Sequence, residues 1–485
     1  MNWWLLLGFL NVIVCSQGVL GSAFYCVDHY QKPLRHRTRS CPPLSEKRSA
    51  TNDQDLPRIY VHFQCGDPDI DACNKAKALF SKAGDIISSV LKLETAIHVN
   101  ATYLPFCKTF NECDTDKDGR TIGQAFPTVS YLMTDPTDNV TRMYPQAILK
   151  QFTHVLRPSW TTYDMNAQFN SEVNWYFQEE GVKMKSDQTD FLRTVIHEYI
   201  HGLGFITGWT DRLYHRFRPY ADPLTAFLTP MMLSPPNQTP QIRKSFLSDD
   251  GLQPFWGFVE FPLDKFIHHN KTKLSTMTQI LNKLGNSNVL YKSLLDMIND
   301  WCDSNIKDYA EFIYKRATSS RNLAVVVGNH TTLWLETNLT PFLSGSSMSH
   351  VDYDLYNDTE DYLMVYKADP GVDLDMLSQK FPLGPLGPNL VRTLAGLGYA
   401  IQPTFSIKAE PVRPDLQYWQ PSASLVGTDK NPSPAVSTVH GPAHIPQPTH
   451  SISPSSSSAH SSVRCRSSLY IITIVLTLSL LTSLN

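Results

Sequence analysis

The chain has 485 residues, of which 42% are hydrophobic and 18% are charged, and its 42 basic and 45 acidic side chains give a net charge of −3. This length allows one large domain with tails or two to three domains, and the apolar fraction is sufficient for a packed core. Basic residues do not gather in a patch or a stripe, so the composition excludes nucleic acid as the partner.

The N-terminal segment has the features of a secretory signal. An apolar stretch near the start is followed by small residues between positions 18 and 23, which predicts a signal peptide over residues 1–21. A dibasic pair, Lys47–Arg48, follows in a Pro-containing stretch. It indicates either a short propeptide over residues 22–48 or an ordinary exposed loop.

From residue 58 onward the hydrophobic pattern predicts a compact domain. Alternating positions rich in β-branched and aromatic residues indicate strands, and apolar residues at helical spacing without Pro indicate helices. The predicted strands cover residues 58–64, 96–106, 126–133 and 164–169, and the predicted helices cover residues 71–93 and 187–201. Gly202 and Gly204 are well placed to end the second helix. Strands and helices in this order predict an α+β fold of packed layers.

The most specific local motif is TVIHEYIHGLGF, from Thr194 to Phe205. His197 and His201 are four residues apart, so on a helix both imidazoles project from one face and can share a zinc ion. Glu198 lies beside the first histidine, where it can act as the general base toward a water molecule. The alternative is a solvated helix face that carries two histidines by chance. The apolar helix and the secretory context favour one catalytic zinc ion.

A catalytic zinc needs a third protein ligand. The residue six positions after His201 is Thr207, which does not replace histidine, whereas His350 lies in SGSSMSHVDYDLYNDTEDYLMVYK, upstream of Leu363–Met364. This order of motifs resembles that of the leishmanolysin-type metzincin peptidases, in which a long insertion separates the helix motif from a third histidine and a Leu-Met pair forms the Met-turn.

The resemblance also includes TLAGLGY, residues 393–399. It implies a two-lobed, metzincin-like zincin over residues 49–405, with a twisted sheet, an active-site helix and a Met-turn. It further implies that His350 is the third zinc ligand, that Met364 is the Met-turn residue and that Tyr366 helps to hold a developing oxyanion.

The expected function is a secreted or surface-anchored zinc endopeptidase. Its substrate is an extended polypeptide that pairs with an edge strand, for which residues 164–169 are the candidate. One alternative takes Glu260, in WGFVEF, as the third ligand of a gluzincin-like hydrolase. Another is a non-catalytic surface adhesin on a zincin scaffold, against which the intact Glu198 argues, and a third is a zinc hydrolase of another bond. Lesser ligand candidates are His215, His268, His269 and His330.

The nine cysteines favour disulfides in an oxidising compartment. Four of them predict two bridges whose connectivity stays open: Cys65, Cys73, Cys107 and Cys113. Cys26 and Cys41 are expected to form a third bridge. With Cys15 in the signal and Cys465 in a removed tail, seven of nine remain, and Cys302 is the expected unpaired thiol.

The C-terminal part changes composition. Residues 406–460 become rich in Pro and Ser, which predicts a disordered stalk. Residues 461–485 hold a polar spacer and a final apolar segment without a charge after it, the pattern of a GPI-anchor signal; a single membrane helix is the alternative. Seven Asn-x-Ser/Thr sites are acceptors for glycans on the secretory route: Asn100, Asn139, Asn237, Asn270, Asn329, Asn338 and Asn357. Together these features predict a lipid-anchored location on the outer cell surface.

Overall fold

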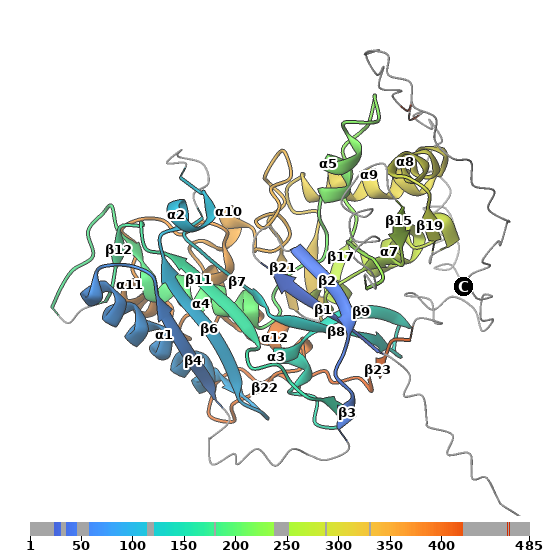
Figure 1. The fold of residues 1–485 in the computed structure, drawn as a ribbon. Helices are drawn as coiled ribbons and strands as arrows, with labels where there is room; N and C mark the ends of the chain where they lie inside the picture. The colour runs from blue at the N-terminus through green and yellow to red at the C-terminus, as the bar shows by residue number, and fades with distance from the viewer. Residues whose placement is uncertain are drawn as a thin grey trace, which may run out of the picture.

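The computed structural model describes residues 24–30, 35–45, 58–113, 121–178, 181–236, 252–286, 289–328, 331–420, 463 and 465. Helices and strands mix along the chain (Figure 1), which confirms the predicted α+β class. The predicted features outside the described residues are the signal peptide, the dibasic pair, residues 421–460 of the stalk and the tail beyond 465. The start of the predicted disordered stalk is wrong, because residues 417–418 form a paired strand and Trp419 is buried. Among the described residues, no helix combines the length and the apolar character needed to cross a bilayer.

Four strands form the sheet beside the candidate site, in the spatial order β4-β6-β11-β7. They are β4 (Ile59–Cys65), β6 (Ile97–Leu104), β11 (Met165–Asn170) and β7 (Gly123–Pro127). The first three run parallel, and β7 pairs with β11 in the antiparallel sense. Burial alternates residue by residue along β6, as expected for a sheet with one covered face. The strands predicted over 58–64, 96–106 and 164–169 are confirmed.

Two helices, α1 (Ile70–Val90) and α4 (Phe191–Gly202), pack against this sheet and against each other. The Asp69 carboxylate caps α1 by accepting hydrogen bonds from two backbone amides of the first turn. Both predicted helices are confirmed, but α4 begins later than residue 187. The reason is that Asp190 caps the N-terminus of α4. Asp190 itself belongs to a short strand, β13 (Thr189–Asp190), which pairs with β12 (Trp175–Tyr176).

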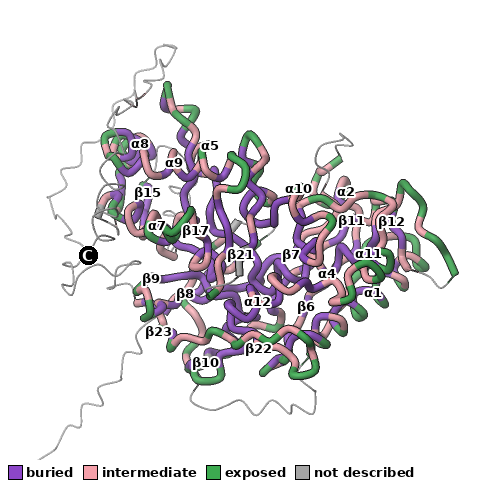
Figure 2. The backbone as a smooth tube through the Cα atoms, turned by 180° about the vertical axis from the view of Figure 1, so that it is seen from behind, coloured by how far each residue is buried: buried purple, intermediate pink, exposed green. Residues whose placement is uncertain are grey.

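Aromatic rings fill the space between these helices and the sheet. The ring of Phe80 in α1 lies 5.0 Å from that of Phe169 in β11 and 5.4 Å from that of Phe191 in α4. Edge-to-face ring pairs of this kind add to the area that each ring buries. Figure 2 shows the consequence: the backbone of α4 and β7 is largely buried, while the outer side of α1 is exposed.

The strand predicted over 126–133 is in fact two strands. β7 ends at Pro127, Thr128 turns the chain, and β8 (Val129–Asp135) belongs to a different sheet. β7 is therefore the edge of the four-stranded sheet, whereas residues 164–169 lie in β11, between β6 and β7. The prediction that residues 164–169 form the edge is wrong, because a hydrophobic pattern identifies a strand but not its neighbours.

A second sheet has the spatial order β2-β1-β8-β23, with β9 also paired to β8. Its remaining strands are β1 (Tyr25–Tyr30), β2 (Arg35–Ser40), β9 (Val140–Pro145) and β23 (Gln417–Tyr418). Val27 in β1 is fully buried, and a disulfide joins Cys26 to Cys41 at the open end of the hairpin. The segment expected as a propeptide or a loop, residues 22–48, thus contributes three strands to the folded body: β1, β2 and β3 (Leu44–Ser45).

A second group of elements follows helix α4 in sequence. Figure 1 labels several of them: α5, α7, α8, α9, β15, β17, β19 and β21. These elements are α5 (Arg212–Phe217), β14 (Met231–Leu233), β15 (Gln253–Phe255), β16 (Gly257–Val259), a 3-10 turn η1 (Pro262–Phe266), β17 (Ile267–His269), β18 (Thr272–Lys273), α7 (Ser275–Leu281), η2 (Leu284–Asn286), β19 (Val289–Tyr291), α8 (Leu294–Asp303), α9 (Ile306–Ala317), β20 (Ala324–Val327) and β21 (Thr331–Trp334). Trp301 and Phe227 stack in its core with ring centroids 4.5 Å apart.

The last segment packs against both groups of elements. It consists of α10 (Tyr353–Tyr356), a 3-10 turn η3 (Tyr362–Met364), α11 (Leu374–Lys380) and α12 (Pro388–Gly396), which packs on β20 and β21. The short elements that complete the fold are β3 (Leu44–Ser45) with β10 (Arg157–Pro158), β5 (Leu91–Lys92) with β22 (Ala400–Ile401), α2 (Phe106–Phe110) and α3 (Gln146–Leu149).

Four disulfides join described cysteines. The cluster of four forms the two expected bridges, Cys65–Cys73 and Cys107–Cys113, and Cys26–Cys41 is confirmed. The prediction that Cys302 is unpaired is wrong, because Cys302 forms a disulfide with Cys465. Val463 also pairs with the body, since its amide donates to the Tyr220 carbonyl. The expectation failed because it assigned Cys465 to a removed tail and so took away the partner.

Candidate metal centre

Helix α4 presents two histidines on one face because they are one turn apart. The Nδ1 of His197 donates to the Leu363 carbonyl at 2.7 Å, and the Nδ1 of His201 donates to the Phe205 carbonyl at 2.7 Å. The second contact depends on the end of the helix, where Gly204 has a φ of 110°. A Cβ atom there would also lie 2.5 Å from Ile148, so the turn requires glycine.

His350 reaches the same place from a loop that is distant in sequence. Its Nδ1 donates to the Ser346 carbonyl at 3.0 Å, and its own carbonyl accepts from the Glu336 amide at 2.7 Å. The next residue, Val351, bridges both Leu335 and Val365. His350 is therefore held between the strand extension after β21 and the end of η3.

The three imidazoles meet at their Nε2 atoms, and each of the three Nε2–Nε2 distances is 3.1 Å. A carbonyl oxygen can only accept, so each Nδ1 carries the proton and each Nε2 presents a lone pair. Three lone pairs this close repel one another unless a cation lies between them. Three nitrogens at about 2.0–2.1 Å from a tetrahedral zinc ion lie about 3.3–3.4 Å apart, so the observed triangle fits such an ion closely.

Burial keeps these histidines neutral. It lowers the pKa of His197 to about 3 and that of His201 to about 4, and it lowers the pKa of His350 well below the usual value. The main cause is loss of hydration, and neighbouring histidines lower the pKa values of His197 and His350 further. Neutral imidazole is the form that binds a metal ion, and these three residues form the one group among the described His, Cys, Asp and Glu that can hold such an ion.

The three histidines open onto a cavity of about 960 Å³. Glu198, only 7% exposed, lines this cavity beside them. The opposite wall includes the edge strand β7 and residues 121 and 122 before it. Gly123 brings this strand close, because a Cβ atom at that position would lie 3.4 Å from the Cγ of Glu198. The cavity thus combines a triad of metal-ligand type, a carboxylate and a strand edge.

The two other predicted site residues, Met364 and Tyr366, are both among the described residues. Met364 is 1% exposed, and its carbonyl accepts from the Val351 amide at 2.8 Å, which ties η3 to the residue after His350. Tyr366 lines the cavity and stacks edge-on with Tyr353, at 5.8 Å between ring centroids. The sequence did not predict that the carbonyl of Leu363 would accept a hydrogen bond from His197 and so orient its ring.

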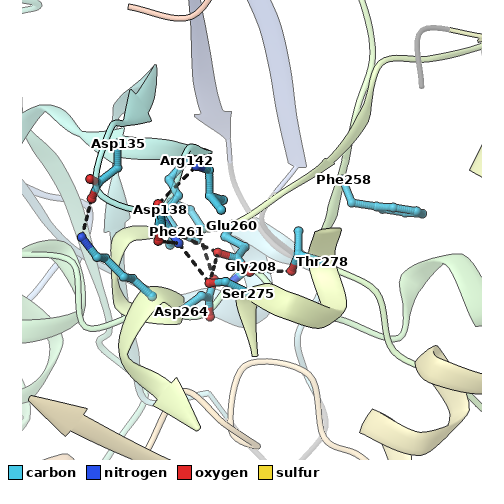
Figure 3. A network of polar contacts seen from close by, with 12 residues as sticks. Asp135, Asp138, Arg142, Gly208, Phe258, Glu260, Phe261, Asp264, Ser275 and Thr278 are labelled. Atoms are coloured by element: carbon cyan, nitrogen blue, oxygen red, sulfur yellow. Dashed lines mark hydrogen bonds and ion pairs between the residues drawn. The ribbon is translucent and has the colours of Figure 1, made fainter. Parts of the chain in front are cut away.

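Glu260 is not part of the triad, so the gluzincin-like alternative is wrong in its third ligand. Its carboxylate is fully buried and accepts hydrogen bonds from Arg142, Ser275 and Thr278 at 3.1, 2.8 and 2.5 Å (Figure 3). The positive charge of Arg142 satisfies it. The physical reason for the error is that a buried carboxylate between aromatic residues can be held by an ion pair as well as by a metal. Two lesser candidates, His215 and His268, also lie outside the triad, as does His269, while His330 is not among the described residues.

The same network holds the cavity wall that follows α4. The Asp264 carboxylate accepts from the Gly208 amide at 2.8 Å (Figure 3). It also accepts from the Thr207 hydroxyl at 2.5 Å. Thr207 and Gly208 both line the cavity. The residue that stands where metzincins place their third histidine therefore positions the wall instead of binding a metal.

The described glycosylation sites differ in their surroundings. Asn139 and Asn270 adopt left-handed backbone conformations, with φ of 59° and 53°, which are typical of turns. Asn338 and Asn357 are half-exposed. Asn100 lies in the middle of β6 and donates from its side chain to Asn166 at 2.9 Å. The two remaining sites, Asn237 and Asn329, lie outside the described residues.

Comparison with known proteins gives a family but no named activity. A relative from Schizosaccharomyces pombe (strain 972 / ATCC 24843), the Uncharacterized protein PB7E8.01, is 25% identical over 377 residues, which are 73% of this chain and 64% of that protein. The chain therefore spans less than two thirds of that relative. No solved structure matches. The model of the SPBPB7E8-like family matches residues 26–439, most of the chain, and the chain belongs to this family.

Proposed function

We propose that this chain is a zinc-dependent endopeptidase of metzincin-like, two-lobed architecture. The observation that supports it best is the convergence of three Nε2 lone pairs at 3.1 Å in a cavity that also contains Glu198. A bound zinc ion supplies a Lewis acid that lowers the pKa of a water molecule toward neutrality. The triad is His197, His201 and His350.

Glu198 is the proposed general base. It follows His197 directly in α4, and its carboxylate lines the cavity that the histidines face. In this position it accepts a proton from the attacking water and delivers it to the leaving amine. Tyr366 also lines the cavity, and its proposed role is to hold negative charge that develops on the carbonyl oxygen of the substrate.

The proposed substrate is an extended polypeptide that lies along β7. Among the described strands, β7 pairs only with β11, and its residues from Gly123 to Phe126 line the cavity. Backbone groups on its outer side can therefore pair with a peptide by β-augmentation. Such pairing reads backbone rather than side chains, so the strand orients many different sequences.

We also propose that the protein reaches the outer cell surface and is attached there by a lipid anchor. Four disulfides within the described residues support a secretory route. Because Cys465 pairs with Cys302, the proposed anchor attaches beyond residue 465. A phospholipase specific for GPI anchors releases the protein from cells if the anchor is present, and leaves it there if a membrane helix holds it.

The function is tested by digestion of a broad peptide library with purified protein. We expect internal peptide bonds to be cleaved, cleavage to stop when a chelator removes the metal, and zinc to restore it. The matched control is Glu198→Gln, which keeps the metal ligands and loses cleavage. Zinc binding without any cleavage would favour the non-catalytic surface protein, and cleavage that survives complete metal removal would contradict the proposal.

A further inference from the structure

Arg193 is the second buried arginine of the described chain, and it differs from the first. Arg142 is fully buried and donates to Asp138, Glu260 and Ser275. Arg193 is 6% exposed, yet its guanidinium has no hydrogen bond or ion pair with any described residue, and the ring of Tyr362 lies 5.5 Å from it. Buried charges are normally paired, so five donors without an acceptor call for an explanation.

The position of Arg193 supplies that explanation. It precedes His197 by one turn of α4, on the same face of the helix, and it lines the same cavity. No side-chain nitrogen of Arg193 is among the fully buried polar atoms without a partner, so these donors reach the cavity that the histidines share. Burial lowers the pKa of the Arg193 guanidinium, and the nearby Tyr362, Asp190 and Asp369 partly offset this effect.

The charges around the cavity are unequal. Among the described residues that line it, the basic side chains are Arg193, Arg212 and Lys367, and the single acidic one is Glu198. Lys367 has a partner, since its Nζ lies 3.5 Å from Asp369. Among the described lining residues, the cavity therefore offers one guanidinium, that of Arg193, without a hydrogen bond or ion pair to a described residue, and no acidic side chain other than the proposed general base.

We propose that Arg193 forms a subsite for a carboxylate of the substrate peptide, next to the scissile bond. The inference rests on the proposed function. A guanidinium presents a rigid fork of donors that matches a carboxylate bidentately, which the ammonium of lysine does not. The cavity then selects peptides in which an Asp or Glu side chain, or a C-terminal carboxylate, reaches Arg193.

Binding is measured in zinc-loaded Glu198→Gln protein, so that the peptides are not consumed. Fluorescence anisotropy compares three kinds of labelled peptide with one parent sequence. The first is a neutral peptide with blocked ends, the second is a set in which Glu replaces Gln at one position at a time, and the third is the neutral peptide with a free C-terminus. We expect Glu at one position to bind about 10–100-fold more tightly than Gln, the range for a hydrogen-bonded charge pair. A gain for the free C-terminus instead identifies the chain end as the source of the carboxylate.

Variants then connect that preference to Arg193. Arg193→Gln in the same background removes the discrimination, and Arg193→Lys keeps part of it because the charge remains while the fork is lost. The matched control is Arg218→Gln, which makes the same charge change at an exposed residue outside the cavity. Bound zinc and the unfolding temperature show that each variant is folded.

Two results overturn the inference. One is equal binding of all three kinds of peptide by the parent protein, which needs no variant to interpret. The other is a folded Arg193→Gln protein that still discriminates Glu from Gln. Failure of the proposed function looks different, since a protein that cleaves no peptide can still show the carboxylate preference. Cleavage without that preference leaves the function in place and removes the subsite.

Discussion

Replacing Glu260 by Ala separates stability from metal binding more sharply than any other single change. Glu260 is completely buried and is the acceptor for three donors: the Nε of Arg142 and the hydroxyls of Ser275 and Thr278. Its backbone carbonyl also accepts from the Met143 amide, a contact that alanine retains. The substitution thus removes the carboxylate and leaves the chain path intact.

The expected loss of stability depends on the contacts that Arg142 keeps after the substitution. Removal of one partner from a buried ion pair typically costs about 3–5 kcal/mol. Asp138 still receives two hydrogen bonds from Arg142, at 3.1 and 2.7 Å, so we expect the lower end, about 3 kcal/mol. For a domain of this size each kcal/mol lowers the unfolding temperature by roughly 1–2 °C, as extrapolated from smaller domains. The Ala variant should therefore melt about 3–6 °C below the parent.

Calorimetry and zinc analysis are made on the same samples. Glu260→Gln is the matched control, because it keeps one carbonyl oxygen as an acceptor and should lose only about 1–2 kcal/mol. Both variants should retain the zinc of the parent protein after dialysis against a mild chelator, whereas His350→Ala should come out without zinc. An Ala variant that melts like the parent but binds no zinc would refute the reasoning and restore Glu260 as a ligand.

Three further predictions follow from single features. Glu198→Gln should keep zinc and the unfolding temperature but lose at least about 10²–10⁴-fold in peptide cleavage, which steady-state kinetics measures; near-normal rates would remove Glu198 from the mechanism. Non-reducing peptide mapping of the mature protein should find Cys302 linked to Cys465, and a free thiol at Cys302 would disprove this bridge. Glycopeptide analysis should find a glycan on the exposed turn residue Asn270 and none on Asn100, whose amide is engaged within a strand; the reverse pattern would contradict these placements.

Two of the three histidines of the candidate metal centre could be predicted from local spacing alone. Two histidines at a spacing of four lie on one helix face whatever the rest of the fold does, and α4 confirms the helix. His350 was predicted from the order of motifs, because no local rule connects it to His201, 149 positions earlier. Its meeting with the helix depends on strand bridges at Val351 that a linear pattern does not contain.

The walls of the cavity could not be predicted in the same way. The apolar run from Phe126 to Met133 reads as one strand, and the turn at Thr128 that divides it is stabilised by partners distant in sequence, His29 and Asp164. The position of β7 at the sheet edge follows from that division. Likewise, the lack of a hydrogen-bond partner for the Arg193 guanidinium among the described residues depends on its surroundings, which the sequence alone does not reveal.

The central claim is that His197, His201 and His350 together hold one zinc ion. Crystals of protein loaded with zinc, with diffraction collected on both sides of the zinc absorption edge, test it directly. We expect one anomalous peak per chain at about 2.0–2.1 Å from each of the three Nε2 atoms, and no such peak among these residues in His350→Ala crystals. An empty triad in zinc-loaded crystals, or an ion held by other residues, would contradict the account.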